Sequence, residues 1–172
     1  DITMTWWAQG NYNYREKYYL SASLGMTSSS RFGTNVSNGV NMFRVPWGIF
    51  PSVSGAWVMS AEPWFKVPFI DYLRINAGYD LTGNDGFDDT ASKTFFSSVK
   101  FLQVTGLTMT NIGNSSLQWE TTNKLTAGIN MNLFGNRLAI DANVFKSNTD
   151  NLLSISALSF LTGIETSWTN GG

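Results

Sequence analysis

Acidic side chains are concentrated in one stretch of this sequence, which reads DLTGNDGFDD from Asp80 to Asp89. Closely spaced oxygen ligands suit calcium, so Asp85, Asp88 and Asp89 form a candidate site for that ion. The stretch lacks the ligand spacing and the distal glutamate of an EF-hand loop, however. A solvated Asn-Asp-Gly turn is the favoured interpretation, and we predict no metal and no cofactor.

The chain offers little for catalysis. It has no histidine and no cysteine, which excludes Ser-His-Asp chemistry, histidine acid–base catalysis and histidine or thiolate metal sites. The neighbours Asp88 and Asp89 would point to opposite sides of a strand, unlike the facing carboxylates of a glycosidase. The 11 Lys and Arg against 12 Asp and Glu provide no basic surface for nucleic acid. We predict no catalytic residue and no nucleic-acid partner.

A second set of polar side chains occurs at positions that alternate with apolar ones. Its members are Arg74, Asn76, Asp80, Glu120, Lys124 and Asp141. These side chains could line the path of a polar substrate. Alternatively the charged members form cross-strand pairs that hold a hydrated wall together, and this second interpretation is favoured.

Period-two alternation identifies the elements that carry these residues. Within residues 73–82, every second position is apolar and the positions between are polar or small, as in a strand with two unlike faces. The same pattern recurs in residues 4–14, 18–26, 50–60, 119–134 and 138–145. No long amphipathic helix can be assigned. The sequence therefore predicts an all-β, antiparallel fold with six strands.

The connections between these strands alternate in length. Residues 14–17 and 134–137 read as tight hairpin turns. The link through residues 61–71 contains two prolines, which cannot serve a central ladder. Residues 27–46, 82–116 and 150–172 form much longer segments. Short turns alternating with long loops are typical of a transmembrane β-barrel.

Composition also favours a membrane protein. Only 13% of residues are charged, against roughly 25% in soluble domains, and aromatic residues gather near the strand ends as in interfacial girdles. We therefore expect the apolar face to meet lipid and the polar face to meet water. The expected lipid-facing residues are Leu73, Ile75, Tyr79, Leu125, Ile129, Leu138 and Ile140. A soluble β-sandwich would alternate in the same way, with its apolar residues turned inward.

Six strands are too few to close a barrel with a packed interior. Residues 82–116 have some strand character and could supply two more, giving a minimal barrel of eight. More naturally, the chain is a segment of a larger barrel.

Four blocks of the sequence resemble the barrel of SusC/RagA-type TonB-linked outer-membrane transporters: residues 14–33, 48–63, 73–86 and 117–153, in matching order and spacing. The resemblance implies that residues 1–172 are a partial domain from the C-terminal part of a barrel of about 22 strands, without the N-terminal plug. Two departures stand out. The acid and glycine that the family usually places before Ser-Ser-Arg-Phe are absent, and residues 87–116 match no family block.

The resemblance further implies a segment of a TonB-dependent importer of oligosaccharides or peptides in the cell outer membrane of a Gram-negative bacterium. The implied partners are outer-membrane lipid, a SusD-like surface lipoprotein, the substrate, and the TonB complex through the missing N-terminal part. Polar wall residues could also contact the plug. Two alternatives remain: a structural or adhesive outer-membrane barrel that transports nothing, and a soluble carbohydrate-binding β-sandwich.

Overall fold

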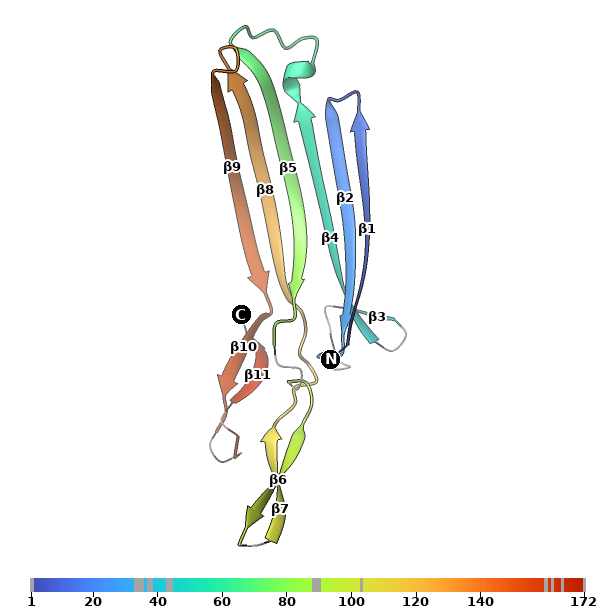
Figure 1. The fold of residues 1–172 in the computed structure, drawn as a ribbon, viewed down its shortest axis with the longest axis vertical. Coiled ribbons are helices and arrows are strands. Elements are labelled where there is room, and N and C mark those ends of the chain that lie inside the picture. Colours follow the sequence, from blue (N-terminus) through green and yellow to red (C-terminus); the bar gives the residue numbers. More distant parts are fainter. Residues whose placement is uncertain are drawn as a thin grey trace.

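A single antiparallel sheet of long strands dominates the computed structural model (Figure 1). The structure describes residues 2–32, 36, 39–42, 45–87, 91–102, 104–159, 161, 163–164 and 166–171. The long strands follow the order β1-β2-β4-β5-β8-β9, and a short strand, β3, pairs with β4. Their bounds are β1 Thr3–Tyr14, β2 Tyr18–Ser29, β3 Val40–Met42, β4 Val45–Val58, β5 Ile70–Asn84, β8 Glu120–Leu133 and β9 Leu138–Asp150.

The six long strands are those that alternation predicts. Five of them reach further than predicted at one end or both, whereas β8 is one residue shorter at each end. They contain 12 to 15 residues, more than the 9–11 that a tilted strand needs to cross a bilayer. The register places apolar residues of neighbouring strands side by side. For example, Ile75 lies between Trp57 and Ile129 on the two adjacent strands. Apolar positions therefore continue across strands as well as along them. The predicted all-β antiparallel architecture is confirmed.

Short turns join the strands at the upper end of the sheet in Figure 1. Between β1 and β2, Lys17 N donates to Tyr14 O over 3.1 Å, and the two central residues, Arg15 and Glu16, have φ values of 52° and 58°. Two consecutive positive φ angles are typical of a type I′ turn, whose twist matches that of paired strands. Asn13 Oδ1 accepts a hydrogen bond from Glu16 N over 3.0 Å and supports this conformation.

The opposite end carries the long connections, which contain two further hairpins. The first pairs β6 (Phe95–Phe101) with β7 (Val104–Asn111), and the second pairs β10 (Leu152–Ala157) with β11 (Thr166–Gly171). Residues 82–116 thus contain strands, but the structure does not support the alternative in which they add two strands to the wall and give a barrel of eight. These strands form a separate two-stranded sheet beyond the main one (Figure 1).

A compact hydrophobic cluster ties the long connections together. Its buried members come from three separated parts of the chain: Phe32, Val36, Phe87, Ala91, Leu117 and Trp119. The Phe32 and Trp119 ring centroids lie 4.1 Å apart, and those of Phe32 and Phe87 lie 5.0 Å apart. Phe50 from the wall and Trp168 from β11 pack against the cluster. The main buried core of the described residues therefore lies at the end of the sheet and not behind either face.

A three-residue 3-10 helix, η1 (Met59–Ala61), opens the link between β4 and β5. Among the described residues, no helix has the length and apolar character needed to span a membrane.

Candidate functional site

On β2 and β5 of the main sheet, the two faces differ in exposure in the opposite sense to a soluble domain. Along the middle of β5, Ile75, Ala77 and Tyr79 are exposed, whereas Arg74, Asn76 and Asp80 between them are half-buried. In the first half of β2 the same alternation holds, with apolar side chains exposed and Ser21 and Ser23 partly covered. In the described part of the chain, no second sheet covers the apolar face. A β-sandwich would bury that face between two sheets.

The residues expected to face lipid all share this apolar face through the strand register. Most are well exposed, including Ile75 at 41% and Leu125 at 58%. Leu73 departs from the others, because only 8% of it is exposed and its side chain is covered by protein. Tyr19 lies on the polar face, opposite Ala56.

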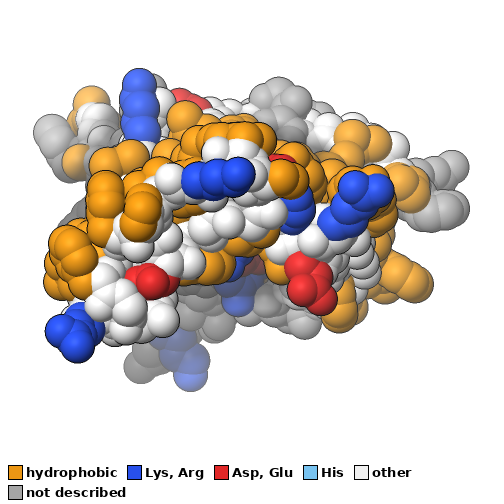
Figure 2. Space-filling view, turned by 90° about the horizontal axis from the view of Figure 1, so that it is seen from above, with side chains coloured by type: hydrophobic (Ala, Val, Ile, Leu, Met, Phe, Trp, Pro, Cys, Tyr) orange, Lys and Arg blue, Asp and Glu red, His pale blue; other side chains and the backbone are white. Residues whose placement is uncertain are grey.

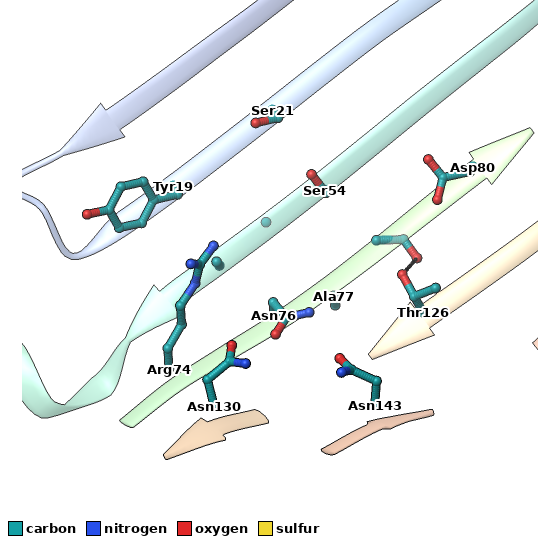
Figure 3. Close-up of a pocket in the computed structure, with 13 residues that line it drawn as sticks. Tyr19, Ser21, Ser54, Arg74, Asn76, Ala77, Asp80, Thr126, Asn130 and Asn143 are labelled. Atoms are coloured by element: carbon teal, nitrogen blue, oxygen red, sulfur yellow. Dashed lines mark hydrogen bonds between the residues drawn. The ribbon is translucent and has the colours of Figure 1, made fainter. Parts of the chain in front are cut away.

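The polar face is hollowed by a groove of about 440 Å³. It runs across β2, β4, β5, β8 and β9, and small residues such as Gly55, Ala56 and Gly78 keep its floor low. Of the six polar residues that sequence analysis singled out, the groove brings together Arg74, Asn76 and Asp80 (Figure 3). Sequence reasoning did not single out the other polar lining residues: Tyr19, Ser21, Ser54, Thr126, Asn130 and Asn143.

Arg74 lies at the groove end nearer the short turns. Its side chain reaches from β5 over β4 towards Tyr19 on β2 (Figure 3), and its guanidinium carbon lies 5.6 Å from the centre of the Tyr19 ring. The Nε atom is buried without a hydrogen-bond partner in the described structure. No carboxylate of the described residues forms an ion pair with this arginine. The groove therefore presents a fixed cation.

Asparagine side chains form the middle of the groove around Gly128. A Cβ added at Gly128 would collide with the Asn143 amide and lie 2.9 Å from Asn76 Nδ2, so only glycine leaves room for both amides. Next to them, Asn130 Nδ2 donates to Asp141 Oδ1 across β8 and β9. Asp141 is thus engaged in a cross-strand hydrogen bond with a neutral side chain.

Asp80 lies at the groove end nearer the long connections. Lys124 is directly opposite it in the register of β5 and β8, but the Lys124 ammonium lies 5.4 Å from the centre of the Phe145 ring. Among the described residues, Asp80 has no ion pair. The groove consequently has a cationic end and an anionic end, joined by neutral hydrogen-bonding side chains.

A second groove of about 450 Å³ continues from Asp80 towards the long connections. Trp7 and Phe50 line it on either side of Gly25, which pairs with both in the register. The polar face thus carries an aromatic zone next to its anionic end.

The acidic stretch and Glu120 lie at the same end but serve turns and strand ends. Glu120 Oε2 accepts a hydrogen bond from Leu153 N over 2.9 Å, and Glu120 Oε1 accepts one from Asn84 Nδ2 over 3.3 Å. Asn84 Oδ1 also accepts from Gly86 N over 3.0 Å, which is an Asx turn. Asp88 and Asp89 lie outside the described residues. Within those described, no cluster of three acidic side chains could hold a metal ion.

A charged cluster that sequence reasoning missed lies at the short-turn end. Glu62, just after η1, accepts hydrogen bonds from Tyr18 Oη over 2.7 Å, Lys17 Nζ over 3.1 Å and Trp57 Nε1 over 3.2 Å. The Tyr18 hydrogen bond, followed by that of Lys17, holds the pKa of Glu62 below its ordinary value of 4.5. The signal available in the sequence was a lone acid in an aromatic, proline-containing link. Figure 2 shows charged side chains set among hydrophobic ones at this end.

Comparisons with known proteins agree with this geometry. Residues 2–172 match the family described as TonB dependent receptor-like, beta-barrel. TonB-dependent receptors P39 and P3 of Formosa agariphila are 34% and 30% identical to the chain over 86% and 94% of its length. The chain spans only 14% and 16% of those relatives.

Solved structures of transporters have the same fold. A structure of the RagAB peptide transporter matches 99% of the chain with a TM-score of 0.83 at 23% identity. The RagAB peptide importer in its closed-closed state matches 98% with a TM-score of 0.83 at 22% identity. In both cases the chain covers 18% of the solved chain.

Proposed function

Because this chain belongs to the TonB-dependent receptor-like β-barrel family, we propose that it is a section of the wall of a nutrient importer in the bacterial outer membrane. The exposed apolar face contacts lipid and the grooved polar face lines the hydrated interior through which cargo passes. The long connections lie on the extracellular side, and the short turns on the periplasmic side.

The observation that carries this proposal is the inverted exposure of β2 and β5 in the main sheet. Burying Arg74 or Lys124 in hydrocarbon near the midplane would cost about 2–4 kcal/mol each, whereas facing a water-filled interior costs little. The outer edges of β1 and β9 pair with no other described strand. In the full-length protein we expect these edges to pair with further strands, because an open edge is not tolerated in lipid.

The cargo class and the lid partner follow from the resemblance to SusC/RagA-type transporters. We propose uptake of oligosaccharides or peptides beneath a SusD-like lipoprotein, energised by TonB through parts of the protein outside this chain. The name of the RagAB peptide transporter supports a peptide cargo and a two-component assembly for a protein of this fold.

Energised uptake by cells that produce the full-length protein tests this function. We expect accumulation of labelled oligosaccharide or peptide that disappears when TonB is removed and when the short-turn half of the wall is disrupted. Surface exposure of the loops without any TonB-dependent uptake would favour the structural or adhesive barrel instead.

A further inference from the structure

We infer that a groove on the apolar face of the main sheet binds one acyl chain of a lipid in the outer leaflet of the membrane. The groove has a volume of about 410 Å³ and is lined by Met4, Trp6, Met26, Met42 and Trp47. This inference rests on the proposed place of the chain in an outer-membrane wall. It goes beyond that proposal, because it assigns a defined lipid site to one part of the apolar face.

The register of three strands places the groove on the apolar face. Trp6 on β1 lies opposite Met26 on β2. In the next row, Met4 lies opposite Ser28, and Ser28 lies opposite Trp47 on β4. Both rows belong to the face on which the other apolar residues of β2 are exposed. Ser28 is small and buried, so the space between the two large side chains of its row stays open.

Protein side chains bound the groove on two sides. Met4 and Trp6 form one wall on β1. Met42 forms the other on β3, which pairs with β4 at the end of the sheet that carries the long connections (Figure 1). Trp47 is only 7% exposed and forms the base, whereas Trp6 is 66% exposed and forms the rim. A further strand paired with the free edge of β1 would lie outside the wall of Met4 and Trp6, so it would leave the groove open.

The depth of the groove matches the level at which outer-leaflet acyl chains begin. At the short-turn end, Tyr18 lies between Tyr14 and Trp57, with ring centroids 6.4 Å and 6.2 Å away. Such a row of aromatic rings is typical of a membrane interface. A tilted strand crosses the hydrocarbon in about 9–11 residues. Counted from Tyr14 along β1, this length ends between Trp6 and Met4.

The chemistry of the groove fits a lipid tail. Its lining consists of three methionines and two tryptophans, without a charged group. Methionine is unbranched and polarizable, and it adapts to irregular apolar shapes. Its volume lies within the range of small-ligand sites. If the groove stayed empty, its side chains would lack partner atoms on one side and would lose dispersion contacts. A linear acyl chain supplies those contacts at a depth where water does not.

Photocrosslinking of the full-length protein in phosphatidylcholine vesicles tests the inference. One probe is a phosphatidylcholine with a diazirine near the head-group end of an acyl chain, and the second has its diazirine at the terminal methyl. Mass spectrometry of the irradiated protein gives the labelling of each peptide. The row of Tyr12 and Leu20 is the reference, because both residues are exposed on the same face close to the opposite interface.

With the first probe, we expect the groove residues to be labelled about threefold or more above this reference row. The reason is that a chain held between side chains makes additional dispersion contacts. The second probe should show no excess at the groove, because its diazirine reports on the bilayer centre.

Variants that fill the groove locate the site. Met26→Trp and Met42→Trp should each reduce groove labelling by the first probe to the level of the reference row. Leu20→Trp adds the same ring on the same strand outside the groove and should leave groove labelling unchanged. Heat-modifiable gel migration identifies the folded barrels. Met42 lies on a three-residue strand at the edge of the wall, so Met42→Trp tests the site even if Met26→Trp prevents assembly.

The outcomes separate the inference from the function on which it rests. Even labelling of the apolar face, or an excess that survives the filling variants, overturns the acyl-chain site and leaves the membrane wall standing. Labelling of the reference row without labelling of the groove also overturns the site, since another part of the full-length protein then covers it. Absence of labelling over the whole apolar face overturns both.

Discussion

Asp80 and Lys124 are direct cross-strand neighbours on the polar face, yet the lysine ammonium lies over Phe145, 5.4 Å from its ring centre. Opposite charges at such positions usually stabilise a sheet by a few tenths of a kcal/mol to about 1 kcal/mol. Here the aromatic ring competes successfully for the cation, as expected where a cation–π contact has a similar value. The groove keeps a free negative end as a result.

This competition predicts a measurable coupling. In a double-mutant cycle on Asp80 and Lys124, we expect an interaction energy near zero in the wild-type background. Replacing Phe145 with Leu releases the lysine, and the same cycle should then give about 0.5 kcal/mol. Urea unfolding of the full-length protein in vesicles provides the free energies. A clear coupling already present in the wild-type background would contradict this description.

The facing of β5 predicts opposite tolerance at adjacent positions. Ile75→Arg places a charge on the lipid side and should cost about 2–4 kcal/mol, enough to impair membrane assembly. Asn76→Arg places the same charge in the hydrated groove and should be tolerated. Heat-modifiable gel migration of the full-length protein distinguishes folded from unfolded barrels. Equal behaviour of the two variants would refute the facing, and Leu73 is avoided because it is covered by protein.

Close packing around Phe50 predicts that Gly83 is intolerant of even one methyl group. A Cβ added there would collide with the Phe50 ring, which packs against the cluster of the long connections. Gly83→Ala should displace the ring and raise hydrogen exchange around Phe32, Phe87 and Trp119 together. Gly10→Ala is the matched control, because nothing lies within 4 Å of its added Cβ. Unchanged exchange in the Gly83 variant would show that the ring adapts freely.

The depressed pKa of Glu62 predicts a pH dependence with a definite sign. A carboxyl group whose folded pKa is lowered stabilises the native state fully above its unfolded pKa, and this contribution disappears as pH falls through the folded pKa. Acidification below the ordinary value of 4.5 should therefore lower the barrel's melting temperature. Glu62→Gln should flatten this dependence, and an identical acid slope in both proteins would contradict it.

The β1–β2 turn predicts a stabilising substitution. Arg15 and Glu16 both adopt positive φ angles, which cost side-chain-bearing residues about 1–2 kcal/mol each. Replacing the pair with Asn-Gly, the preferred type I′ sequence, should raise stability by about 1 kcal/mol in urea unfolding. Arg15→Ala serves as the control and should give no gain, since alanine is no better suited to this conformation.

Alternation in the sequence was sufficient to predict the six long strands and their faces, because the period of two depends only on local geometry. The hairpin within residues 95–111 was recognisable as strand, but its exclusion from the wall was not, since periodicity does not specify a pairing partner. Strands β3, β10 and β11 were missed because they contain only three to six residues each. The TonB-linked barrel suggested by the four sequence blocks is confirmed at the level of family and fold.

The site was predictable in part for the same reason. Parity along β5 placed Arg74, Asn76 and Asp80 on one face, and all three line the groove. The Tyr19 ring beside Arg74 depends on the register across three strands, which no single strand encodes. Glu62 and Lys17 are 45 residues apart, so their ion pair could not be read from local spacing.

Because Phe32, Phe87 and Trp168 belong to three different segments of the chain but pack into one cluster, we expect these segments to be exchangeable between proteins only as a set. If one of them were grafted onto another barrel, its aromatic side chain would lack the residues that it packs against here. Substitutions in one of these segments should therefore require compensating substitutions in the other two.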